Sequence, residues 1–156
     1  DIVHAAHDSR DAATTEGGTY LMVNSNPAAL VTGGMASTFT VAARAATAKG
    51  LVGDDLIRET YRGVVIHEAG HLANNAFRGK IVDLVVDPLI LQLGTEDSKI
   101  QRWLEKNVST YAGFGGPEEA AAEVFAATIM KHKLPSELYF SRDTILKMVG
   151  PHSKTR

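Results

Sequence analysis

Five consecutive residues, His67-Glu68-Ala69-Gly70-His71, constrain the structure of this chain more than any other segment. Residues four apart lie on the same face of an α-helix, so the two imidazoles can bind one metal ion. Glu68 follows the first histidine and can take a proton from a metal-bound water. The alternative is a helix that carries two ordinary histidines. The motif predicts a helix that supplies two ligands of a catalytic metal.

The sequence around the motif predicts a helix of some twenty residues. Asp54 or Asp55 is a suitable N-terminal cap, and the helical pattern continues to about Phe77. Gly63 and Gly70 each destabilise a helix interior by roughly 1 kcal/mol relative to alanine. Their presence is understandable if another backbone packs closely against this helix.

Composition excludes several classes of partner and site. The chain has 156 residues, of which 44% are hydrophobic, and a formal net charge of −2, which indicates a single domain spanning residues 1–156. This charge gives no reason to expect nucleic acid or an anionic membrane as a partner. The lack of cysteine excludes disulfides, thiolate zinc sites and a cysteine nucleophile. No apolar run reaches the roughly 18 residues of a membrane span.

The N-terminal segment gives weaker signals. The chain begins at Asp1 without a methionine, so we expect a processed protein or a domain of a larger polypeptide. Residues 1–17 are polar and alanine-rich, which predicts a flexible or loosely packed arm. His4 and His7 in this arm are the alternative candidates for a second metal site.

Three segments have the composition of β-strands, namely residues 19–24, 36–42 and 81–86. We expect the first two to be antiparallel neighbours. Helices are expected from about Glu96 to Asn107 with a cap at Thr95, from Pro117 to about Lys133, and over residues 136–148. The glycine-rich segment 109–116 is expected to be an irregular loop. Together these elements predict an α+β fold, with a small, mostly antiparallel sheet packed on the long zinc-binding helix.

A catalytic zinc ion needs a third protein ligand besides the two histidines. The continuation found in metzincins would place Gly at 74 and His at 77, but Asn74 and Phe77 occupy these positions. The other late histidines, His132 and His152, carry no motif. The third ligand is therefore sought among acidic residues.

Two acidic candidates remain. Gly94-Thr95-Glu96-Asp97 is similar to the Gly-Thr-x-Asp of aspzincin peptidases, in which the Asp is a ligand, although the start of a helix also explains these residues. Glu119 and Glu123 lie four apart, among almost wholly apolar neighbours on a helix that we expect to be buried. Because a buried carboxylate requires a partner, a metal ion and its histidines would satisfy this pair.

The motif together with the later Tyr-Ala and Pro-x-Glu-x-x-x-Glu-x-Phe-Ala segments resembles the gluzincin metallopeptidases. It is most similar to the lethal-factor type and to related toxin- and phage-associated zinc peptidases. The resemblance covers residues 54–130 and implies that Glu119 is the third zinc ligand. It also implies that Glu123 supports the site from behind and that Tyr111 assists the reaction.

The function expected from this resemblance is zinc-dependent hydrolysis of peptide bonds. Zn²⁺ is held by His67, His71 and Glu119, Glu68 is the general base, and Tyr111 hydrogen-bonds the developing oxyanion. We expect a protein or peptide substrate, aligned by the predicted edge strand 36–42. A secreted or a virion- or toxin-associated setting is favoured over the cytoplasm. The alternatives are a zinc-stabilised binding module without turnover and an aspzincin-like peptidase that uses Asp97.

Overall fold

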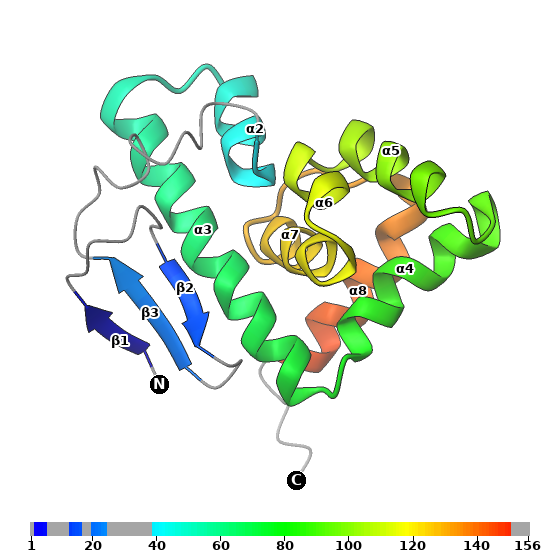
Figure 1. Ribbon diagram of the computed structural model, residues 1–156. Coiled ribbons are helices and arrows are strands. Elements are labelled where there is room, and N and C mark those ends of the chain that lie inside the picture. Colours follow the sequence, from blue (N-terminus) through cyan, green and yellow to red (C-terminus); the bar gives the residue numbers. More distant parts are fainter. Residues whose placement is uncertain (1, 6–12, 17–19, 25–38, 151–156) are drawn as a thin grey trace, which may run out of the picture.

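The computed structural model describes residues 2–5, 13–16, 20–24 and 39–150 of the chain (Figure 1). Residues 39–150 are 79% helical and contain no strand. The helices are α2 (Val41–Ala48), α3 (Gly53–Ala76), α4 (Lys80–Leu93), α5 (Asp97–Asn107), α6 (Thr110–Phe114), α7 (Pro117–Ile129) and α8 (Tyr139–Val149), with a 3₁₀ turn, η1, at Ser136–Leu138. The body of the protein is therefore a helical bundle.

The predicted α+β fold is wrong for this reason. The segment 81–86, expected to be a strand, forms the first half of α4. In the other expected strand, Thr40 is the N-cap of α2 and Val41 its first residue, while residues 36–38 lie outside the described residues. Because this segment is not a strand where it is described, the expectation that it aligns a substrate as an edge strand is wrong as well.

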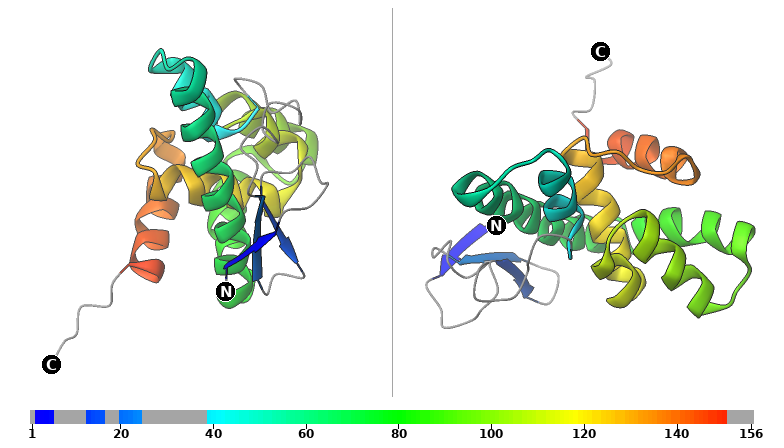
Figure 2. Two further views of the ribbon diagram at one scale, coloured as in Figure 1. Left: turned by 90° about the vertical axis from the view of Figure 1, so that its left-hand side faces the viewer. Right: turned by 90° about the horizontal axis from the view of Figure 1, so that it is seen from above.

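Three short strands precede the helical body. These are β1 (Ile2–Ala5), β2 (Ala13–Glu16) and β3 (Tyr20–Asn24), in the order β1-β3-β2. β1 is parallel to β3, and β2 is antiparallel to it. The strands lie beside α3, on the side away from α4 (Figure 1, Figure 2). Two of them come from the expected N-terminal arm, and the partner of β3 is not the predicted segment 36–42.

The long helix expected around the motif is α3. It begins at Gly53, with Asp54 and Asp55 in its first turn, and its N-cap is Val52, which makes no side-chain capping hydrogen bond. The carboxylates therefore act on the helix dipole rather than as the expected caps. Because α3 has 24 residues, the motif lies in its C-terminal half, as predicted.

α7 lies between α3 and α4 (Figure 1). Pro117 is in its first turn, where the missing N–H leaves no hydrogen bond unmade. Its residues 120–128 are all buried, so both sides of the helix are packed. This helix therefore joins the two halves of the bundle.

α4 shows why the strand prediction failed. Ile81, Val85 and Leu89 are each fully buried and recur every four residues, which is the period of one helix face. The apolar, β-branched run hides this period. Pro88 lies inside α4 and cannot donate to the carbonyl four residues earlier. That carbonyl accepts a hydrogen bond from Ser141 Oγ on α8 at 2.5 Å, so α8 replaces the missing donor.

The segment 109–116 is not the expected loop. Ser109 caps α6 by accepting a hydrogen bond from the Ala112 amide at 3.1 Å. Gly113 lets α6 approach α5, because a Cβ there would lie 2.6 Å from the Gln101 carbonyl oxygen. The glycines thus allow close packing of a short helix.

None of the described helices is long and apolar enough to cross a membrane.

Candidate metal centre

The side chains of His67 and His71 on α3 meet that of Glu119 on α7. The three potential ligand atoms all lie within 4.8 Å of one another. Glu119 Oε2 lies 2.8 Å from His67 Nε2 and 3.2 Å from His71 Nε2. Tetrahedral ligands about 2.0–2.1 Å from a zinc ion lie roughly 3.3 Å apart. The donor set and spacing thus fit a zinc ion.

Small residues bring the two helices close enough for this arrangement. A Cβ added to Gly70 would lie 3.0 Å from Phe125 Cδ1 and 3.2 Å from Ala122 Cα on α7. A Cβ on Gly63 would overlap Ala42 Cβ on α2. The expected close approach of another backbone to the motif helix is confirmed at both glycines.

Glu123 lies behind His67 and is 1% exposed. Its Oε1 is 2.7 Å from His67 Nδ1. Its Oε2 accepts hydrogen bonds from the Val41 amide and from Ser109 Oγ, both at 2.6 Å. Because a carboxylate only accepts, Nδ1 carries the proton. The lone pair of a neutral His67 is then on Nε2, directed toward Glu119.

The carboxylates around His67 favour a positive charge in the site. Burial lowers the pKa of His67, but hydrogen bonds to Glu119 and Glu123 and the charges of Glu123 and Glu68 outweigh burial and raise it to about 10. Burial alone would raise the pKa of Glu119, yet its hydrogen bonds to both imidazoles and their charges hold it well below its usual range. A site that stabilises an imidazolium in this way also has the charge to attract a metal cation.

Tyr111, which was expected on a loop, is on α6 and covers the imidazole of His67. The two rings stack with centroids 5.4 Å apart, and Phe39 stacks on the other face of Tyr111 at 5.0 Å. Burial, the charge of Glu119 and a hydrogen bond with it raise the pKa of Tyr111 well above its usual range. The phenol is therefore neutral and directed toward the proposed ligands.

Gly115 gives Tyr111 and Glu119 the room they need. A Cβ at this position would lie 2.6 Å from Glu119 Cγ and 3.0 Å from Tyr111 Cε2. The glycine-rich segment between α6 and α7 therefore passes directly over the site.

The charge of Glu68 raises the pKa of both His67 and Tyr111, so its carboxylate acts electrostatically on the site. The side chain of His67 is 4% exposed, whereas those of His71 and Glu119 are 17% and 24% exposed. The site is thus closed behind His67 and open to solvent at the other two residues.

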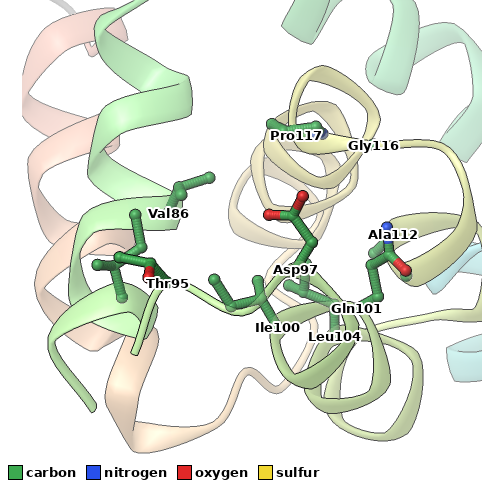
Figure 3. Close-up of a pocket in the computed structure, with 11 residues that line it drawn as sticks. Val86, Thr95, Asp97, Ile100, Gln101, Leu104, Ala112, Gly116 and Pro117 are labelled. Carbon is green, nitrogen blue, oxygen red and sulfur yellow. The ribbon is translucent and has the colours of Figure 1, made fainter. Parts of the chain in front are cut away.

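Asp97 is not part of this group. It begins α5 and lines a separate cavity of about 170 Å³ between α4, α5, α6 and the start of α7. Its carboxylate points between Val86 and Pro117 (Figure 3). The N-cap of α5 is Glu96, whose side chain makes no capping hydrogen bond, so the expected cap at Thr95 is wrong. The described structure therefore groups Glu119, not Asp97, with the two histidines.

His132 does not belong to the group formed by His67, His71 and Glu119. His132 is 8% exposed, and its Nε2 has no hydrogen-bond partner among the described residues. His4 lies in β1, whereas His7 and His152 lie outside the described residues. No second group of metal-binding side chains occurs in the part of the chain that the structure describes.

Sequence reasoning missed Ser109, Phe39 and the Val41 amide. Ser109 precedes a Thr-Tyr-Ala run and could have been found as a helix cap. The other two come from a segment interpreted as a strand, so no local signal connected them with the motif.

A scan against known protein families, a search of curated proteins and a search of solved structures each found no match. The site is therefore interpreted from its geometry and from the sequence resemblance.

Proposed function

We propose that the chain is a zinc-dependent metallopeptidase of the gluzincin type, in which His67, His71 and Glu119 bind Zn²⁺. The observation that carries this proposal is the convergence of their three ligand atoms within 4.8 Å. The charge of Glu68 acts on His67, and two of the three side chains are partly exposed. Three protein ligands with an open side are typical of catalytic zinc.

The proposed mechanism assigns proton transfer to Glu68. Held by His67, His71 and Glu119, a zinc ion would polarise the scissile carbonyl and make a water nucleophilic at neutral pH. Glu68 takes a proton from that water as it attacks the carbonyl carbon. It then delivers the proton to the departing amine nitrogen as the C–N bond breaks. The carboxylate ends the cycle unprotonated.

Tyr111 and Glu123 have different parts in this proposal. The pKa of Tyr111 is raised, so the phenol keeps its proton and donates it in a hydrogen bond to the oxyanion. Glu123 accepts from His67 Nδ1 and fixes the orientation of the ring without touching the substrate.

The proposed partner is a protein or peptide substrate. The resemblance to toxin- and phage-associated peptidases supports a secreted or a virion- or toxin-associated setting.

A zinc-stabilised binding module without turnover is the alternative function. Such structural sites usually complete four-coordination with protein ligands. The group has three such residues in the described part of the chain, and a purely structural zinc site needs no general base such as Glu68. The open side favours turnover.

Glu68→Gln tests the proposed function. The substitution keeps the shape of the side chain and all three proposed ligands, so zinc content should stay near one per chain. Loss of the general base should reduce cleavage of a casein-like substrate by on the order of 10²–10⁴-fold. Zinc content and cleavage rate are measured on the same preparations. Undiminished cleavage by the Gln variant would exclude this mechanism, and zinc binding without cleavage in the wild type would favour the binding module.

A further inference from the structure

Ser109 contacts two parts of the candidate site through one hydroxyl group. Ser109 Oγ donates a hydrogen bond to Glu123 Oε2 at 2.6 Å and accepts one from the Ala112 amide at 3.1 Å. The residue is fully buried, so water cannot replace either contact. The first contact leads through Glu123 to His67, and the second holds the start of α6.

α6 depends on such contacts because it has only five residues. A helix of this length is not stable by itself. Besides the Ser109 cap, the Tyr111 amide donates to the Phe39 carbonyl at 2.9 Å. The position of the Tyr111 ring over His67 therefore follows from where these few bonds hold α6.

Glu123 depends on Ser109 in a similar way. Its Oε2 has two short donors, the Ser109 hydroxyl and the Val41 amide. Without the hydroxyl, the carboxylate can turn about its last side-chain bond, and Oε1 then moves relative to His67 Nδ1. An outer partner that shifts in this way lowers the metal affinity of the histidine that it orients.

We propose that Ser109 is a positioning residue that couples the orientation of the ligand His67 to the placement of Tyr111. This inference rests on the proposed function for the role of Tyr111, but its effect on His67 and on zinc affinity holds without any cleavage. Ser109 touches neither metal nor substrate. It acts through Glu123 on one side and through α6 on the other.

Ser109→Ala tests the proposal, with Ser141→Ala as the matched control. Ser141 is an equally buried serine, and its hydroxyl bonds the Leu84 carbonyl between α8 and α4. We expect Ser109→Ala to weaken zinc binding by roughly 10- to 100-fold. The control should lose thermal stability and bind zinc with unchanged affinity. Equal zinc affinity in both variants and the wild type would overturn the proposal.

Two further variants separate the hydroxyl from the helix cap. Glycine is nearly as good a cap as serine, so Ser109→Gly removes chiefly the bond to Glu123 and keeps the test open if the Ala variant does not fold. It should lose zinc affinity in the same range. Ser109→Thr restores the hydroxyl and should recover most of it. A Gly variant with wild-type zinc affinity would show that the bond to Glu123 has no positioning role.

The His67 ring gives a readout that a purely structural role would not move. Its Nδ1 proton, held by Glu123, should give a slowly exchanging NMR signal in the zinc-loaded protein. Ser109→Ala and Ser109→Gly should shift this signal and speed its exchange with water, whereas Ser141→Ala should leave it unchanged. An unshifted signal in both Ser109 variants would contradict the proposal. If Glu68→Gln did not alter cleavage, the proposed peptidase mechanism would be wrong. The NMR evidence for the positioning role of Ser109 would be unaffected.

Turnover tests whether Ser109 also acts through α6 on Tyr111. The double variant Ser109→Ala/Tyr111→Phe should lose less kcat than the product of the two single losses. Once the Tyr111 hydroxyl is removed, displacing α6 can no longer misplace it. Strictly multiplicative effects would show that Ser109 does not act through Tyr111.

Discussion

The α3–α7 region and the α4–α8 region of the bundle bury polar groups in different ways. Between α4 and α8, Ser141 donates one hydrogen bond to the carbonyl that Pro88 leaves without a donor. Between α3 and α7, the buried carboxylate of Glu123 and the buried imidazole of His67 face each other, with Glu119 in front. The first arrangement serves the backbone alone, whereas in the second one carboxylate bonds the Val41 amide and also faces an imidazole.

The difference indicates where function lies. Burying ionisable groups destabilises a fold, and apolar residues of similar size often serve stability as well or better. Ile81, Val85 and Leu89 show that this chain can pack an apolar core beside α7. The ionisable groups in the α3–α7 region therefore support the proposed metal site. Variants of the two regions should accordingly separate function from stability.

The largest of the effects that separate the regions is expected for Tyr111→Phe. The variant keeps the stacked ring and deletes only the hydroxyl. Removal of an oxyanion donor raises the barrier by about 2.7–4 kcal/mol, so turnover should fall on the order of 10²–10³-fold. Zinc content and melting temperature should hardly change. A Phe variant with wild-type turnover would show that the hydroxyl takes no part in the reaction.

Ser141→Ala should have the opposite profile. It leaves the half-buried Leu84 carbonyl without a donor, which should lower the free energy of unfolding by about 1 kcal/mol, while zinc affinity and turnover stay the same. Pro88→Ala restores an N–H in α4, so the Ser141 substitution should be less destabilising in that background. Equal losses in both backgrounds would contradict the assigned role of Ser141. Denaturant unfolding of the four proteins measures this.

The smallest effect concerns pH and His132. Burial lowers the pKa of His132, and the charges of Lys49 and Arg62 lower it further against the opposing charge of Glu59. His132 therefore binds a proton less readily in the folded protein than in the unfolded chain, which does so below about pH 6.5. Stability is therefore lost as pH falls below that value. His132→Leu should reduce the loss between roughly pH 7.5 and 5.5, and an unchanged loss would contradict a lowered pKa of His132.

The sequence predicted α3 and its motif well because the signals there are local. The histidine spacing, the acidic first turn and the end near Phe77 all lie within one helix. The pair of glutamates was found because acidic residues among alanines and apolar residues are unusual on a buried helix. The structure brings Glu119 and Glu123 to the motif.

The failures have the opposite cause. In residues 81–86, the choice between strand and helix depends on burial at Ile81 and Val85, which only the packed neighbours decide. At 109–116, the glycines were interpreted as signs of a loop. Gly113 and Gly115 instead allow contact with α5 and with Glu119. Contacts between distant segments determine the conformation of these elements. Local patterns in a single sequence do not reveal such contacts.

The central claim is that Glu119 completes a zinc site with His67 and His71, and zinc affinity tests it most directly. Wild-type protein should bind one zinc ion per chain. Glu119→Ala should weaken binding by more than the roughly 10- to 100-fold that loss of an outer partner causes. Asp97→Ala, which alters an acidic residue outside the group, should keep wild-type affinity. If Glu119→Ala retains the metal, or if Asp97→Ala loses it, the proposed ligand set is wrong.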